Sequence, residues 1–420
     1  MEQKKTRIRW YILSLLFVAT TLLYIDRAAL GIMAPYLQGA VGWTEKQYGY
    51  ITSSFMIGYA ICFLLMGRFV DKVGTRKGYT IAIGLWSVAQ LIHSVVSSWI
   101  GFAVSRFALS VGQSGNFPVA IKTVAEWFPK KERALAVGIF NGGANVGTMI
   151  APLVIPAVVL WFDSWRTAFV WTFPVSVIWI VCWLKFYSKP EQSNKVNRAE
   201  LDYILSDAEE ATSQKVSYGK LLGIRATWAI LVGKFIADPI WWFYLFWGAK
   251  YLYTKFGLNL SEIGLPFFAI YLVSWCGGIA LGWLSSRLLK NGGNLNRGRK
   301  LSMLACAVCA LPVMFVPYMD NVWAAVALIA VAAGGHCGWS ANIFSLMSDV
   351  FPKKVTASIS GLGGFAGAMG GVIAPILIGS ALQGAGADGY TIPFTVAAFG
   401  YFFALSIIQL LLPRIQPVKM

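Results

Sequence analysis

Several charged side chains lie within stretches of the chain that are otherwise apolar. In the segment YIDRAALGIM (residues 24–33), Asp26 and Arg27 are adjacent charges in a run of apolar and small residues from Trp10 to Ala34. A charge at the centre of a membrane helix costs about 2.5–3.5 kcal/mol on insertion scales. An arginine can bind a carboxylate through two parallel hydrogen bonds, and a desolvated carboxylate gains a proton more readily. These residue types therefore suggest anion binding together with proton transfer.

Further ionisable residues lie inside other apolar segments. They are His93, Arg106, Lys122, Lys234, Asp238 and His336. Among the ionisable residues well inside the apolar segments of the N-terminal half, the cations Arg27, Arg106 and Lys122 accompany the single carboxylate Asp26. A pair between Asp26 and Arg106 or Lys122 would lock two helices together, but it would account for only one of the three cations. Because buried positive charge needs an anion beside it, the composition favours a small organic anion as the substrate.

Polar and aromatic residues near these charges could bind the rest of an organic anion. Gln113 follows Arg106 by seven residues and shares its helical face, whereas Pro118 should kink that helix before Lys122. Amides could bind hydroxyl groups, and aromatic faces in DPIWWFYLFW (residues 238–247) could stack on a sugar ring. The candidate substrate-binding residues are Tyr24, Arg27, Tyr59, Gln113, Lys122, Asn141, Asn145, Trp242, Tyr244, His336 and Asn342.

The elements that position these residues must be membrane helices. Of the 420 residues, 57% are hydrophobic and only 13% are charged, whereas soluble domains carry about 25% charged residues. A span needs roughly 20 apolar residues, and a soluble enzyme would need long polar stretches, which only residues 187–227 provide. We predict twelve spans, at residues 10–34, 48–67, 79–98, 99–128, 135–160, 165–186, 228–252, 264–288, 301–319, 322–348, 355–383 and 390–412.

Basic residues concentrate in alternate loops. One set comprises Lys4, Lys5, Arg7, Arg9, Arg68, Lys72, Arg76, Lys77, Lys130, Lys131, Arg133, the basic residues of 187–227, Lys290, Arg297, Arg299, Lys300, Lys353 and Lys354. The other loops and their edges hold only Lys46, Arg166, Lys250 and Lys255. This positive-inside pattern predicts cytoplasmic termini. The net charge of +17 then reflects topology and contact with membrane lipid, and no nucleic-acid partner is expected. The first helix lacks a cleavage site and should be retained.

An internal repeat predicts the domain organisation. The segment FPKKERALAVGIFNGGANVGTMIAP (residues 128–152) aligns without a gap on FPKKVTASISGLGGFAGAMGGVIAP (residues 351–375). The two copies lie six predicted helices apart. We therefore expect an all-α polytopic fold of two pseudo-symmetric six-helix bundles, residues 1–186 and 228–420, joined by a cytoplasmic linker at 187–227. Such halves are typical of alternating-access carriers. Glycines in both copies should allow close helix contacts.

The loop GRFVDKVGTRK (residues 67–77) resembles the signature loop of the major facilitator superfamily, G-x-x-x-D-R/K-x-G-x-R-K. Gly67 should permit close packing near the end of helix 2. Asp71 should pair across to the end of helix 11 and hold an inner gate shut, while Arg76 should anchor the loop at the lipid headgroups. We therefore assign Gly67, Asp71 and Arg76 to gating.

Longer motifs resemble the hexuronate transporters of the anion:cation symporter family over essentially the whole chain. They are YIDRAAL, NFPVAIKTVAEWFPKKERALAVGIFNGGANVG, AELDYI, DPIWWFYLFW and HCGWSANIFSLMSDVFP. The resemblance implies that Arg27 binds the substrate carboxylate, with Tyr24 and Tyr59 lining the site. It also implies a proton-coupling role for Asp26, supported by Arg106. Lys122 and His336 match positions shared with hexuronate carriers.

The resemblance fails at Gln113, where the family usually has a glutamate. Glutamine donates and accepts hydrogen bonds but cannot titrate. We expect import of a hexuronate such as galacturonate or glucuronate across a bacterial inner membrane by alternating access, with proton symport. Sodium coupling, uncoupled exchange, an aldonate or other organic anion substrate, and a non-transporting sensor on a carrier fold stay open. The protein should act as a monomer.

No enzyme or cofactor motif is present. The sequence lacks H-E-x-x-H, G-x-S-x-G and P-loop motifs. Cys306 and Cys309 form a C-x-x-C with no second pair or histidine nearby, so they predict ordinary helix packing. We expect neither catalysis, nor a metal, nor a cofactor.

Overall fold

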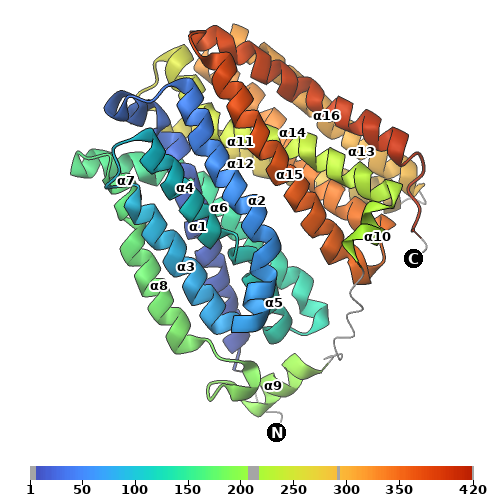
Figure 1. Cartoon of the computed structure of the whole chain (residues 1–420). Coiled ribbons are helices and arrows are strands. Elements are labelled where there is room, and N and C mark those ends of the chain that lie inside the picture. The colour runs from blue at the N-terminus through green and yellow to red at the C-terminus, as the bar shows by residue number, and fades with distance from the viewer. Residues whose placement is uncertain (1–5, 207–216, 291–293, 419–420) are drawn as a thin grey trace. The chain divides into compact units, whose positions relative to one another are not determined.

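The computed structural model describes residues 6–206, 217–290 and 294–418, and within these ranges it is helical without any β-strand (Figure 1). Lys4 and Lys5, which entered the topology prediction, lie outside the described residues. The first part of the chain forms α1 (Ile8–Val41), α2 (Glu45–Val73), α3 (Thr75–Ile92), α4 (Trp99–Gln113), α5 (Asn116–Trp127), α6 (Lys130–Phe162), α7 (Thr167–Val170) and α8 (Thr172–Phe186).

The predicted linker contains short helices only, η1 (Pro190–Gln192), α9 (Arg198–Leu205) and α10 (Tyr218–Leu222). The rest of the chain forms α11 (Arg225–Phe256), α12 (Gly264–Lys290), α13 (Leu295–Ala310), η2 (Leu311–Tyr318), α14 (Val322–Val350), α15 (Lys353–Leu382), η3 (Gly386–Tyr390) and α16 (Thr391–Leu411). Every predicted span coincides with one or two of these elements.

Ten helical segments of the described chain are long and apolar enough to cross a membrane. The two predicted spans outside this set are α3 and the α4–α5 pair. Arg76 and Lys77 lower the mean hydropathy of α3. The next span is divided because Pro118 lacks an N–H and its ring clashes with the carbonyl four residues earlier, at Ser114. The helix accordingly stops at Gln113 and restarts at Asn116, as the expected kink at Pro118 implies.

Glycines of the repeat make equivalent contacts in the two halves. A Cβ added at Gly147 of α6 would lie 2.4 Å from the Thr21 carbonyl oxygen of α1, and one added at Gly370 of α15 would lie 2.3 Å from the Phe235 carbonyl oxygen of α11. Gly147 and Gly370 occupy the same position in the repeat. The expected close helix contacts are therefore confirmed, and each repeat helix packs on the first long helix of its own half.

The chain separates into two compact units, Met1–Ala29 with Ile61–Thr212, and Leu30–Ala60 with Ser213–Met420. The segment Leu30–Ala60, from the end of α1 and the start of α2, thus groups with the later helices. Within this second unit, the Tyr48 hydroxyl donates to the Phe246 carbonyl oxygen at 2.6 Å, and the Ser53 hydroxyl donates to that of Val372 at 2.7 Å. The division at 186 and 228 remains a prediction.

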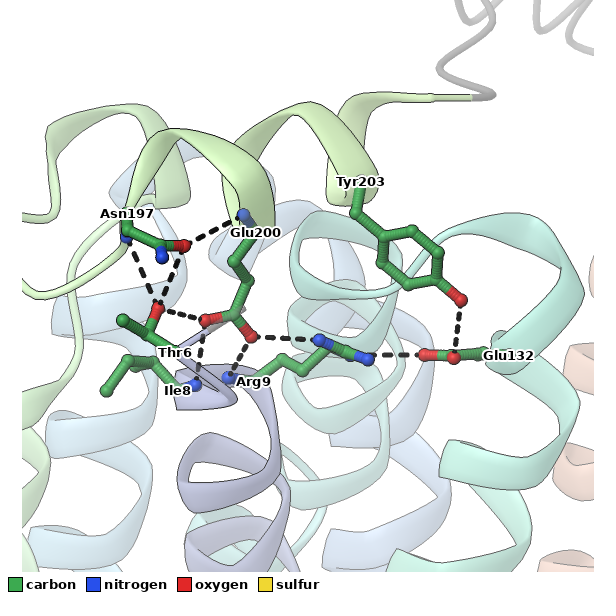
Figure 2. A network of polar contacts seen from close by, with 7 residues as sticks. All are labelled: Thr6, Ile8, Arg9, Glu132, Asn197, Glu200 and Tyr203. Atoms are coloured by element: carbon green, nitrogen blue, oxygen red, sulfur yellow. Dashed lines mark hydrogen bonds and ion pairs between the residues drawn. The ribbon is translucent and has the colours of Figure 1, made fainter. Parts of the chain in front are cut away.

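Helix α9 of the linker binds the N-terminal end of α1 through a polar network (Figure 2). Glu200 is fully buried, and its carboxylate accepts hydrogen bonds from the Ile8 backbone N–H at 2.9 Å and from Nη1 of Arg9 at 2.9 Å. Nε of Arg9 also donates to Glu132 at 3.1 Å, and the Tyr203 hydroxyl donates to the same carboxylate at 2.7 Å. The linker therefore joins α1 and α6 within the first unit.

Candidate functional site

Arg27 lies on α1 and is only 1% exposed. Its Nε donates a 3.1 Å hydrogen bond to Oε1 of Gln113, whose own Nε2 donates to the Leu23 carbonyl oxygen at 3.2 Å. The guanidinium carbon lies 4.9 Å from the centre of the Tyr24 ring, a distance at which a cation is attracted to the face of an aromatic ring. Gln113 and Tyr24, both from the candidate set, thus hold the Arg27 guanidinium in place inside the protein.

Arg106 of α4 is fully buried and donates through Nη2 to the Arg27 carbonyl oxygen at 3.2 Å. Asp26 is 1% exposed, and its charge interacts with the Thr172 hydroxyl and the Arg106 guanidinium. Neither Asp26 oxygen accepts a hydrogen bond of ordinary geometry within the described residues. Arg106 therefore bonds the Arg27 backbone and interacts electrostatically with the Asp26 carboxylate, which links the two adjacent charges of the YIDRAAL motif to α4.

Lys122 has a partner that the sequence did not suggest. Its Nζ lies 2.8 Å from Oδ1 of Asp71, at the end of α2, and the Asp71 side chain is 75% exposed. The expected pair between Asp71 and the end of helix 11 would join the two units and remains a prediction. The contact joins Lys122 of α5 to the end of α2, and the role of Lys122 in substrate binding remains a prediction.

The rest of the signature loop departs in part from expectation. A Cβ added at Gly67 would meet nothing within 4 Å, so close packing does not require glycine there, contrary to our prediction. Gly74 is the constrained position instead, because its φ of +85° lies in the left-handed region that favours glycine. Arg76 donates to the Leu184 carbonyl oxygen near the end of α8, and this bond fixes the loop to the first unit.

The three candidate asparagines lie in different environments. Asn141 is exposed and Asn145 is half-buried, both on α6. Asn342 is buried on α14, and its amide donates to the Ser302 hydroxyl at 3.1 Å and to the Gly338 carbonyl oxygen at 2.9 Å. Asn342 thus links α14 to α13.

The aromatic candidates other than Tyr24 belong to the second unit. Tyr59 is half-buried and stacks on Phe55 with ring centres 6.0 Å apart, and Trp242 stacks on Phe246 at 5.6 Å. Tyr244 is 4% exposed, and its hydroxyl has no hydrogen-bond partner within the described residues.

His336 lies in a second polar cluster, built from α11, α14 and α16. Its Nδ1 is 2.9 Å from the Tyr401 hydroxyl, and its ring stacks on Trp241 at 5.2 Å. On α11, Nζ of Lys234 lies 2.8 Å from Oδ2 of Asp238. The sequence showed that Lys234 and Asp238 are ionisable residues inside a span, but their four-residue spacing could also have signalled this pair.

A buried ion pair at the other end of α11 was missed. Lys250 is 2% exposed and bonds the carboxylate of Glu45 at the start of α2. The sequence predicts a loop-edge charge at Lys250 and no role for Glu45, because their proximity depends on the packing of Leu30–Ala60 against α11. Burial of Lys250 next to an aromatic ring, that of Trp247 at 5.4 Å, reinforces this contact.

No group of three or more histidine, cysteine, aspartate or glutamate side chains positioned for a metal occurs in the described part of the chain. All six cysteines, including Cys306 and Cys309, carry free thiols.

These features define a class of protein. A sequence model of the Major Facilitator Superfamily matches residues 16–375. The chain belongs to this superfamily, and it is a multi-pass membrane transporter rather than an enzyme.

Individual relatives within the superfamily are similar over most of their length. The chain is 31% identical to the hexuronate transporter of Escherichia coli K12 over 379 residues, which cover 89% of this chain and 87% of the relative. It is 32% identical to the galacturonate transporter of Dickeya chrysanthemi, over 78% of this chain and 96% of the relative. It is 30% identical to the D-galactonate transporter of Escherichia coli O6:H1 strain CFT073, over 91% of each.

The fold also matches solved structures. The crystal structure of a bacterial homolog of the human lysosomal transporter Spinster, in an inward-facing and occupied conformation, has a TM-score of 0.80. It is 15% identical to this chain, and the match covers 96% of each chain. At this identity the likeness establishes the fold alone, which is the major facilitator fold expected from the sequence.

Proposed function

We propose that this protein imports a sugar acid, a hexuronate such as galacturonate or glucuronate, by alternating access. The observation that carries the proposal is the buried Arg27 guanidinium, oriented by Gln113 and Tyr24. The planar guanidinium can donate two parallel hydrogen bonds to a carboxylate. The attraction between the two charges is stronger in a site without water than in bulk water. The hexuronate and galacturonate transporters among the relatives support this substrate class.

We also propose an orientation of the chain in the membrane, with both termini on the cytoplasmic side. Basic residues at the N-terminal end of α1 and in the α2–α3 loop favour the cytoplasmic side, and Arg9 and Arg76 lie in these two regions. We infer a bacterial inner membrane as the location, with both termini in the cytoplasm and a monomer as the working unit.

Proton symport is the coupling that we favour, with Asp26 as a titrating group supported by Arg106. Gln113 carries no titratable proton, which keeps sodium coupling and uncoupled exchange as the alternative mechanisms. The galactonate transporter among the relatives makes an aldonate the alternative substrate.

Counterflow in proteoliposomes tests the function. Vesicles loaded with unlabelled galacturonate should take up labelled galacturonate, and an excess of the true substrate outside should suppress that uptake. A panel of galacturonate, glucuronate, galactonate and neutral galactose separates the candidates. Counterflow of labelled galactonate but of neither hexuronate would replace the hexuronate assignment, and counterflow of none of the acids would overturn the function.

A further inference from the structure

The second unit contains an ion pair of its own at membrane depth. Lys234 and Asp238 lie one turn apart on α11, with Nζ and Oδ2 separated by 2.8 Å. The Lys234 side chain is 9% exposed and that of Asp238 is 23% exposed. A carboxylate inside a membrane span is costly and is a functional candidate by default.

The repeat gives Asp238 a counterpart in the first half of the chain. In the first half, the carbonyl of Thr21 contacts Gly147, and Tyr24 follows three residues later. In the second half, the carbonyl of Phe235 contacts Gly370, the equivalent glycine, and Asp238 follows three residues later. Asp238 is thus the counterpart of Tyr24, the residue whose ring lies against Arg27.

Glycines leave room for this pair. A Cβ added at Gly367 of α15 would lie 1.9 Å from Oδ2 of Asp238, and one at Gly363 would lie 2.9 Å from Cδ of Lys234. At this level the described residues of α15 contribute glycine and no charge.

The charged and titratable groups around Asp238 come from three helices. Lys234 shares α11 with it. On α14, His336 interacts electrostatically with Lys234, and on α16, Tyr401 bonds His336 and interacts with Asp238. Among the described residues of this cluster, Lys234 is the fixed cation and Asp238 is the carboxylate.

We propose that Asp238 is a second proton-carrying carboxylate of this transporter, which exchanges its bond to Lys234 for a proton during transport. The inference rests on the proposed proton symport. Protonation removes the counter-ion of Lys234, so an anionic group of the substrate can take its place. Proton and substrate then bind together without leaving net charge in the cluster. Gln113 cannot carry such a proton, because a glutamine amide does not titrate.

Substrate and proton fluxes measured together in proteoliposomes test this role. The Asp238→Asn variant should keep galacturonate counterflow but move fewer protons per substrate than wild type. Asp320→Asn, a change at an exposed aspartate in the loop before α14, should keep the wild-type ratio. A wild-type ratio in Asp238→Asn would overturn the proposal.

A double variant separates proton transfer from a structural role. Lys234→Met with Asp238→Asn removes both charges and leaves no cation stranded in the membrane. If the pair were structural only, this variant would recover the wild-type proton ratio, which would overturn the proposal. We expect the double variant to keep the lowered proton ratio of Asp238→Asn, with weaker counterflow because it lacks the Lys234 cation that takes the anionic group of the substrate. Wild type that moves galacturonate without protons would refute this inference and the proposed proton coupling but not sugar-acid transport, whereas wild type that moves no sugar acid would refute the function as well.

Discussion

Gln113 accepts a 3.1 Å hydrogen bond from Nε of Arg27, so a neutral amide stands beside the cation that we assign to the substrate. Its amide group is fixed in turn by the Leu23 carbonyl oxygen. Since glutamine adds no charge, the positive charge of Arg27 is not cancelled by this neighbour. A glutamate at the same position would form an ion pair with Arg27 and would compete with a substrate carboxylate.

Gln113→Glu should therefore make the rate of substrate uptake more dependent on external pH than it is in wild type. The new carboxylate must be protonated before a substrate carboxylate can bind Arg27, so uptake should fall as external pH rises and recover as pH falls. Initial uptake rates from pH 5 to pH 8, compared with wild type, measure the effect. An unchanged pH profile would show that residue 113 does not affect substrate binding.

Asp26→Asn should abolish accumulation of substrate against its gradient while leaving exchange. Exchange requires no release of a proton, whereas concentrative symport does. Accumulation under an imposed pH gradient and counterflow without one, measured in the same vesicle preparation, separate the two. If Asp26→Asn vesicles still concentrate galacturonate, Asp26 has a structural role only.

Variants of Lys122 and Asp71, which contact each other, distinguish a role in gating from a role in substrate binding. If both residues serve the gate, Asp71→Asn and Lys122→Met should slow net transport to a similar degree, while the affinity for galacturonate stays within about twofold. If Lys122 binds substrate, Lys122→Met alone should weaken binding about tenfold or more, as expected when a charged hydrogen bond worth about 1.5–3 kcal/mol is lost. Competition constants for both variants decide between these roles.

Glu200→Gln should destabilise the first unit. The substitution leaves Arg9 partly uncompensated, and breaking a buried ion pair typically costs about 3–5 kcal/mol. The neighbouring change Asp202→Asn, at an exposed position of the same helix, provides the control. Thermal unfolding in detergent should show a midpoint lowered by several degrees for Glu200→Gln and an unaltered one for Asp202→Asn. Equal midpoints would show that the docking of α9 contributes little to stability.

Much of the fold could be predicted because it depends on local patterns. Apolar length located the spans, the chemistry of Pro118 located the break between α4 and α5, and the repeat identified Gly147 and Gly370 as contact glycines. Each of these signals lies within one segment or in the comparison of two segments.

The partners of individual polar residues could not be predicted in the same way. Helical phase placed Gln113 and Arg106 on one face, and both contact α1, but it could not show that Gln113 bonds the Arg27 side chain. The pairs Lys122–Asp71 and Lys250–Glu45 depend on how separate helices pack. Periodicity within one helix contains no information about that packing.

The most direct test is the binding of galacturonate to the Arg27→Lys variant. An ammonium cannot reproduce the planar, bidentate guanidinium, and loss of a charged hydrogen bond worth about 1.5–3 kcal/mol corresponds to about a tenfold to hundredfold weaker affinity. Arg166→Lys, at an exposed arginine before α7, provides the control at equal abundance in the same vesicles. We predict weakened galacturonate counterflow in Arg27→Lys and wild-type counterflow in Arg166→Lys. Wild-type affinity and counterflow in Arg27→Lys would contradict the assignment of Arg27 to the substrate carboxylate.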